Sequence, residues 1–185
     1  MEKLNATQRI EKAHVSIMGH DATRAYSSIL MVGSVTVDAK TKTAYTNGRD
    51  EIYGEKFIDE LNDAELRFVI LHECYHKLYR HLTTWRHLYD QNAQCANMAC
   101  DFVINQKIAD DNQQDGFAKV PDIGCCVDEK YRGWDSAAVF KDLMKDAKEQ
   151  PQGGGQGQGK PMDGHGWDEA KEMSVEDQKA LERDI

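Results

Sequence analysis

Apolar residues recur at helical spacing in several stretches of this chain. The clearest stripe lies within residues 61–82 and consists of Phe68, Leu71, Tyr75, Leu78 and Leu82. It predicts a long helix there, and Asn62 with Glu65 has the spacing of a capping box at its start. Similar patterns predict four further helices, at 7–18, 94–109, 136–148 and 174–184.

Strand-forming residues are concentrated before the long helix. Residues 28–37 are rich in β-branched and other apolar side chains, which favours a strand. Residues 43–46 and 51–53 flank Asn47-Gly48, a dipeptide typical of a hairpin turn. We therefore expect an α+β fold, in which a small twisted β-sheet packs on the helix over 61–82 and a second long helix follows.

Composition divides the chain into three parts. Gly and Gln dominate residues 149–161, which we interpret as a flexible linker. Residues 1–148 then form one globular domain, and residues 162–185 form a polar C-terminal tail with a short helix. We expect this tail to be mobile, and the alternative is that it folds back onto the domain.

Charge and hydropathy exclude several classes of partner. The formal net charge of −9 argues against a nucleic acid. No stretch approaches the roughly 18 apolar residues that span a bilayer, so no membrane partner is expected. The first residues lack the apolar core of a signal peptide, and five cysteines in such a chain indicate reduced thiols in the cytosol. We expect a cytoplasmic protein.

Residues 72–76 carry the strongest chemical signal, His-Glu-Cys-Tyr-His, an H-E-x-x-H motif. His72 and His76 stand one helical turn apart on the same face, so both imidazoles can reach one zinc ion at about 2.0–2.1 Å. Glu73 projects beside that ion, where it can take a proton from zinc-bound water. The alternative is a buried histidine pair satisfied without metal.

Asp101 is the best candidate for a third ligand, because catalytic zinc sites usually have three protein ligands. It lies in the helix predicted over 94–109, one turn from both Asn97 and Asn105. Amides in these positions can hold a liganding carboxylate by hydrogen bonds. The alternative is that Asp101 lies on a solvated helix face.

His81 and His165 are further candidates, as ligands or as groups that stabilise an oxyanion. His81 stands five positions after His76, about 140° around a helix, which disfavours it as a third ligand. His165 lies between two glycines, next to a tryptophan, in the polar tail. It would reach the site only if the tail folded back.

Three stretches carry a resemblance to a known family: TAYTNGRDEIYGEKF at 43–57, LHECYHKLYRHL at 71–82 and NMACDFVIN at 97–105. A weaker fourth is YRGWDSAAVFKDLM at 131–144. They resemble the zinc metallopeptidase domain of bacteria and phages that is often encoded ahead of a von Willebrand A-like domain. In this chain Ala96 stands where that family has a tryptophan, and we expect no such second domain after residue 185.

The resemblance implies a zincin-like fold with an active-site helix and a following ligand helix. It also implies zinc-dependent hydrolysis of peptide bonds, with Asp101 as third ligand and Asn97 and Asn105 near it. By the same resemblance, a separate von Willebrand A-like or ATPase chain would be a partner. If the protein is phage-encoded, it would act in the cytosol of the bacterial host.

We therefore expect a zinc metallopeptidase acting on protein or peptide substrates. One zinc per chain would be held by His72, His76 and Asp101, with Glu73 as general base. One alternative is a non-catalytic zincin-like scaffold or binding protein, against which the presence of Glu73 argues. Another is a different zinc-dependent hydrolase, such as a ribonuclease using three histidines that include His81.

Overall fold

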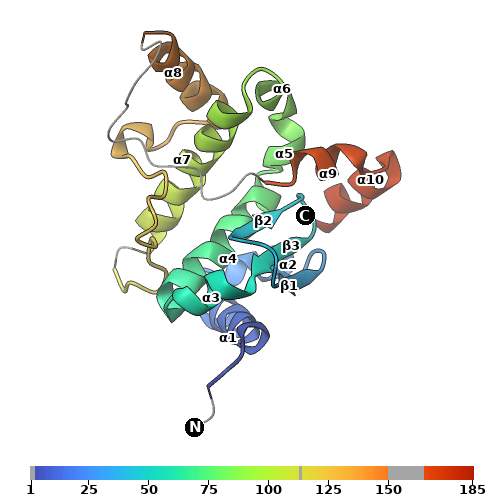
Figure 1. Ribbon diagram of the computed structural model, residues 1–185, viewed down its shortest axis with the longest axis vertical. Helices are drawn as coiled ribbons and strands as arrows, with labels where there is room; N and C mark the ends of the chain where they lie inside the picture. Colours follow the sequence, from blue (N-terminus) through green and yellow to red (C-terminus); the bar gives the residue numbers. More distant parts are fainter. Residues whose placement is uncertain (1–2, 113, 150–164) are drawn as a thin grey trace.

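The computed structural model describes residues 3–112, 114–149 and 165–185. These residues form the expected α+β fold, in which a small three-stranded sheet packs against a larger body of helices (Figure 1). The predicted linker lies outside the described residues except for its first residue, Glu149. The division of the chain at residue 148 therefore stays a prediction. Among the described helices, none combines the length and apolar character that crossing a bilayer requires.

The sheet has the strand order β1-β3-β2. Strand β2 (Ala44–Thr46) pairs antiparallel with β3 (Glu51–Gly54), while β1 (Val35–Asp38) runs parallel to β3 on its other side. The predicted hairpin is confirmed. In its turn, Asn47 Oδ1 accepts hydrogen bonds from the main-chain N–H groups of Arg49 and Asp50, at 3.0 and 2.8 Å. Strand β2 is an edge strand of this sheet.

The expected strand over 28–37 is wrong in its first half. Residues Ser27–Leu30 form helix α2, after helix α1 (Ala6–Gly19) and the 3₁₀ turn η1 (Arg24–Tyr26), and the strand begins only at Val35. A short apolar run fits a buried helix as well as a strand, so periodicity alone does not separate them. Gly33 then turns the chain at a φ of 81°, where an added Cβ would meet the Arg49 carbonyl.

The motif helix α4 spans Asp63–Leu78, preceded by the short helix α3 (Glu55–Glu60). Its capping box is present as predicted, because Asn62 Oδ1 accepts from the Glu65 N–H while Glu65 Oε2 accepts from the Asn62 N–H. The predicted helix over 61–82 ends about a turn early. Arg80 takes a left-handed conformation with φ 52°, and the chain changes direction there.

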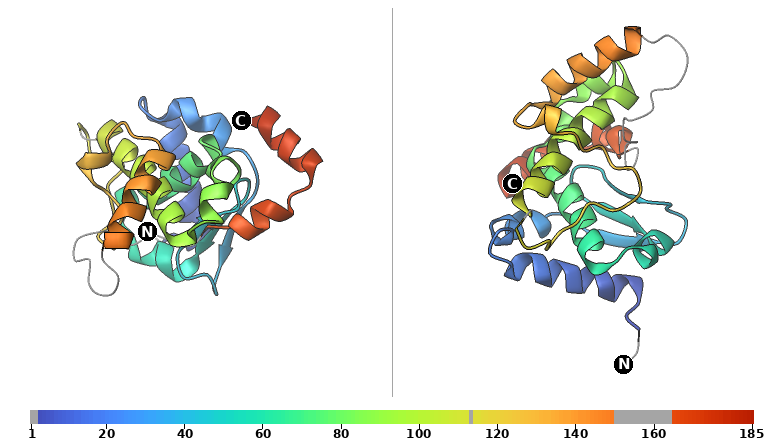
Figure 2. Two further views of the ribbon diagram at one scale, coloured as in Figure 1. Left: turned by 90° about the horizontal axis from the view of Figure 1, so that it is seen from above. Right: turned by 90° about the vertical axis from the view of Figure 1, so that its left-hand side faces the viewer.

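Two short helices, α5 (His81–Thr84) and α6 (Arg86–Tyr89), connect the motif helix to the second long helix. This is α7 (Ala93–Asp111), which packs along α4 and, on another side, against α8 (Ser136–Glu149) (Figures 1 and 2). The connection from α7 to α8 contains one 3₁₀ turn, η2 (Glu129–Tyr131), among its described residues. Helix α4 is buried almost all round between α1, β2 and α7.

The C-terminal residues 165–185 fold back onto the body of the protein. They form α9 (Trp167–Glu172) and α10 (Val175–Asp184), and α9 contacts α5 (Figure 1, red). Trp167 is fully buried. The expectation of a mobile tail is therefore wrong for these residues, because their one large aromatic side chain finds an apolar site against the body.

A buried ion pair connects the motif helix to the sheet. Lys77, the residue after the second motif histidine, lies 2.6 Å from Glu51 of β3, and both side chains are fully buried. Lys77 Nζ also donates to the Val32 carbonyl at 3.0 Å, and the Tyr53 hydroxyl donates to Glu51 at 2.6 Å. A buried pair of this kind contributes orientation more than net stability. It joins the last turn of α4 to the central strand of the sheet.

Candidate metal centre

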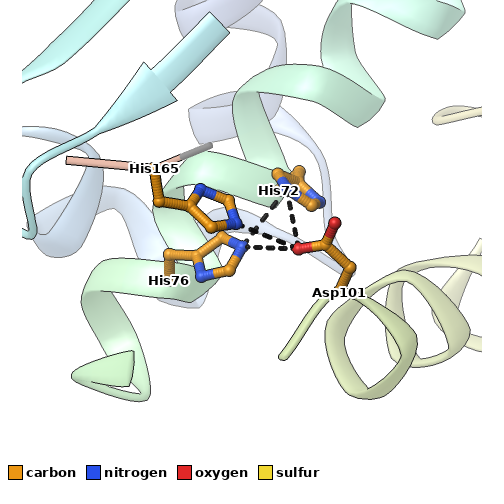
Figure 3. Close-up of side chains that lie close together, drawn as sticks. All are labelled: His72, His76, Asp101 and His165. Atoms are coloured by element: carbon orange, nitrogen blue, oxygen red, sulfur yellow. Dashed lines mark hydrogen bonds and ion pairs between the residues drawn. The ribbon is translucent and has the colours of Figure 1, made fainter. Parts of the chain in front are cut away.

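Four side chains from three parts of the fold converge beside strand β2. His72 and His76 come from α4, Asp101 from α7, and His165 from the segment just before α9 (Figure 3). All four side chains are fully buried. Their candidate ligand atoms all lie within 4.8 Å of one another. The structure thus brings together the three predicted ligands and adds His165 from the tail.

The distances between these atoms fit one small metal ion. Asp101 Oδ1 lies 3.8 Å from His72 Nε2, 3.4 Å from His76 Nε2 and 3.0 Å from His165 Nε2. The two motif Nε2 atoms are 3.2 Å apart. Ligands at about 2.0–2.1 Å in a tetrahedron lie about 3.3–3.4 Å from one another. Imidazole nitrogens and one carboxylate are also a donor set that suits a first-row metal.

Asn105 prepares His72 for such an ion. Asn105 Nδ2 donates to the Cys126 carbonyl at 3.1 Å, which turns Asn105 Oδ1 toward His72 Nδ1 at 2.7 Å. Because that oxygen can only accept, His72 carries its proton on Nδ1. Its Nε2 lone pair then faces the other three donors, which is the tautomer that binds a metal.

The electrostatics favour the protonation states that ligands need. Burial lowers the pKa of His76 well below its ordinary value, and the neighbouring His165 lowers it further, so its imidazole is neutral. Burial alone raises the pKa of Asp101, but the hydrogen bonds from His165 and His76 outweigh burial and hold this pKa well below its usual range. A neutral imidazole and an ionised carboxylate are the forms that coordinate metal.

Glu73 and His81 are not among the four clustered candidate ligands. Glu73 is fully buried on α4. The pKa of Tyr53 is raised first by burial, then by the charge of Glu51 and then by the charge of Glu73. His81 Nδ1 lies 3.1 Å from His76 Nδ1, on the side of that ring away from Nε2. Burial lowers the pKa of His81 to about 3. His81 can orient His76, and the group of four candidate ligands does not include it.

The two asparagines have different partners from those expected. Both were predicted to hold Asp101, but Asn105 contacts His72 and Asn97 Oδ1 accepts from Trp167 Nε1 at 2.6 Å. Spacing along α7 places all three polar residues on one face, but it does not determine which group lies opposite each one. Asn97 therefore anchors the tail two residues after His165.

From sequence alone His165 is only a secondary candidate, although its neighbours carry a signal. The Gly166 N–H donates to the Thr46 carbonyl at 2.8 Å, and a Cβ on residue 166 would come within 2.9 Å of Asn47 Cα. Only a glycine allows this close approach to the hairpin. The glycine after His165 therefore allows the segment to pack against the hairpin. Trp167 holds the segment in place, and helical periodicity did not identify this role.

A helix with an H-E-x-x-H motif, a carboxylate from the following helix and a small sheet beside both define the metallopeptidase class of proteins. The chain belongs to the family described as "Putative metallopeptidase domain", whose model matches residues 5–181. The matched range includes His165 and reaches into α10. No curated protein and no solved structure gives a match to this chain.

We expect Asn105→Ala to weaken metal binding about 10–100-fold, the usual cost of losing a group that orients a ligand histidine. His72 would lose the acceptor that fixes its tautomer. Competition titration with a chromophoric chelator measures the change. Asn112→Ala is the matched control, because Asn112 is also buried, directly after α7, and its side-chain amide donates to the Ile108 carbonyl rather than to a histidine. Equal affinity in both variants would refute the orienting role.

Proposed function

We propose that this protein is a zinc-dependent metallopeptidase. The single observation that carries the proposal is the buried cluster of four donors, two of which come from the H-E-x-x-H helix. The motif glutamate, Glu73, follows His72 on that helix and is fully buried. Three imidazoles and a carboxylate form a borderline nitrogen and oxygen set, for which zinc is the common choice in hydrolases. His72, His76 and Asp101 are the proposed protein ligands.

In the proposed mechanism Glu73 handles the protons. Zinc in this position would lower the pKa of a bound water toward about 7 and polarise a substrate carbonyl. Glu73 accepts the proton at its carboxylate and delivers it to the departing amine, so one residue acts first as base and then as acid. His81 and Asn105 hold the imidazoles of His76 and His72 in orientation.

The edge of β2 supports an extended peptide as substrate. Strand β2 pairs with β3 on one side only, and motif helix α4 contacts it. On its open edge the Thr46 carbonyl already accepts a main-chain N–H, from Gly166, directly beside the cluster. A substrate strand adding to this edge would place its backbone next to the donors.

The experiment is metal analysis combined with a hydrolysis assay. We expect about one zinc per chain and slow cleavage of an unstructured protein such as casein. A strong chelator should stop cleavage, and added zinc should restore it. Protein that holds zinc but never cleaves, including variants with an opened site, would support the non-catalytic scaffold instead.

One observation favours that scaffold as the second candidate. Four protein donors, with His165 as the fourth, form a closed site, as structural zinc sites do. Catalytic sites keep one position open for water or substrate. A peptidase must therefore have a means of opening this centre.

A further inference from the structure

The donor that closes the site differs from the other three in its origin. His72, His76 and Asp101 belong to the two long helices of the core, whereas His165 precedes the short helix α9. His165 lies 64 residues beyond Asp101 in sequence, and the structure brings its Nε2 to 3.0 Å from Asp101 Oδ1. The core therefore offers three donors, and the C-terminal segment supplies the fourth.

The same segment occupies the edge that a peptide substrate would use. The Gly166 N–H pairs with the Thr46 carbonyl at the end of β2, and the backbone there lies against Asn47. His165, the residue before, directs its imidazole into the cluster (Figure 3). One short stretch thus fills both the coordination position and the strand edge.

Backbone strain marks this stretch as functional. His165 has φ 38°, in the left-handed region that residues with a side chain rarely adopt. Such conformations persist only where the surrounding structure holds them, and they are concentrated at ligand clamps and switches. Here the holding contacts follow His165, at Gly166 and Trp167.

The attachment of the segment combines one buried anchor with surface contacts. Trp167 stacks on Tyr89 at 4.7 Å between ring centroids, and its indole N–H bonds Asn97. Arg86 donates to the Trp167 carbonyl at 2.7 Å and lies 3.4 Å from Asp168, whose side chain is largely exposed. Arg80 pairs with Glu182 at the surface. Exposed ion pairs contribute little, so Trp167 is the main attachment.

We propose that residues 165–185 form an autoinhibitory plug in which His165 and Gly166 imitate a bound peptide. This rests on the proposed function, because the plug blocks the position and the edge that a peptidase needs. A substrate strand competes for the β2 edge and displaces the segment from it. Displacement leaves His72, His76 and Asp101 as three ligands and opens the fourth position.

The test uses the cobalt-loaded full chain and acetohydroxamate, a small ligand that binds an open metal position. We expect His165→Ala to keep one cobalt and to bind acetohydroxamate about tenfold or more tightly than the unmodified protein, with a change in the visible cobalt spectrum. His87→Ala, which removes an exposed histidine outside the cluster, is the matched control and should behave like the unmodified protein.

A second pair of variants tests the anchor without touching a donor. Trp167→Ala should also open the site to acetohydroxamate, while Trp167→Phe, which keeps an aromatic ring, should retain most of the closure. Thermal unfolding and circular dichroism establish that each variant is folded. Increased hydrogen exchange in residues 167–184 of Trp167→Ala would show directly that the segment has been released.

Two results would overturn the plug. Loss of cobalt from folded His165→Ala would make His165 a required ligand of a permanent closed site. Equal acetohydroxamate affinity in the unmodified protein and in His165→Ala would mean that the position is already open. The peptidase proposal fails separately: if the opened variants bind cobalt and acetohydroxamate but cleave nothing, the plug stands and hydrolysis does not.

Discussion

The double replacement His72→Ala/His76→Ala should reduce the metal content of the purified protein from about one ion per chain to background. The two imidazoles supply neighbouring Nε2 donors 3.2 Å apart, on a helix that a capping box and a buried ion pair hold in place. Asp101 and His165 alone would leave two donors, which is too few for stable zinc binding. Elemental analysis after dialysis measures the loss.

Thermal unfolding provides an independent measure of the same loss. A ligand that binds only the folded state stabilises it by about 4 kcal/mol when present at a thousand times its dissociation constant. Added zinc should therefore raise the unfolding temperature of the unmodified protein and not that of the double variant. His20→Ala/His87→Ala is the matched control, since neither histidine is in the cluster. Near-stoichiometric zinc in the double motif variant would exclude the proposed centre.

The replacement Glu73→Gln should retain zinc and fold but reduce kcat by about 10²–10⁴-fold, the usual contribution of general acid–base catalysis. Gln has nearly the same shape as Glu, so the packing of this fully buried position should change little. It cannot accept a proton at neutral pH. Because the base acts in the transition state, KM should stay nearly constant while kcat falls.

The comparison requires initial rates of casein cleavage at several concentrations, with zinc content measured in the same samples. Glu60→Gln is the matched control, because it removes an exposed carboxylate from α3 without touching the cluster. Equal rates for Glu73→Gln and the unmodified protein would falsify the general-base mechanism. A loss of zinc in Glu73→Gln would instead assign the residue a structural role in the centre.

Local patterns were sufficient to predict the elements that carry the core of the site. The capping box at Asn62, the stripe along α4 and the i, i+4 histidines all act within a few residues, so the sequence displays them directly. The Asn47-Gly48 turn is of the same kind. Asp101 could be predicted as a ligand because the four-residue spacing of the polar residues on α7 places them on one face of the helix.

Features that depend on distant contacts were not predictable in the same way. His165 meets Asp101 across 64 residues and Trp167 meets Asn97 across 70, and the Gly- and Gln-rich stretch before them shows no periodicity. The early end of α4 depends on the left-handed Arg80, a conformation that the apolar stripe does not reveal. Gly33, shortly before β1, lies against the Arg49 backbone, a contact that the local sequence pattern does not reveal.

The buried pair between Lys77 and Glu51 has a consequence for how this family can vary. Removing one charge leaves the other buried and uncompensated, at a cost of about 3–5 kcal/mol, whereas replacing both with apolar residues of similar volume is often neutral or stabilising. A variant with only one of the two residues replaced is therefore poorly folded. Positions 51 and 77 should change together or not at all among relatives, so their covariation would trace how the motif helix and the sheet evolved as one unit.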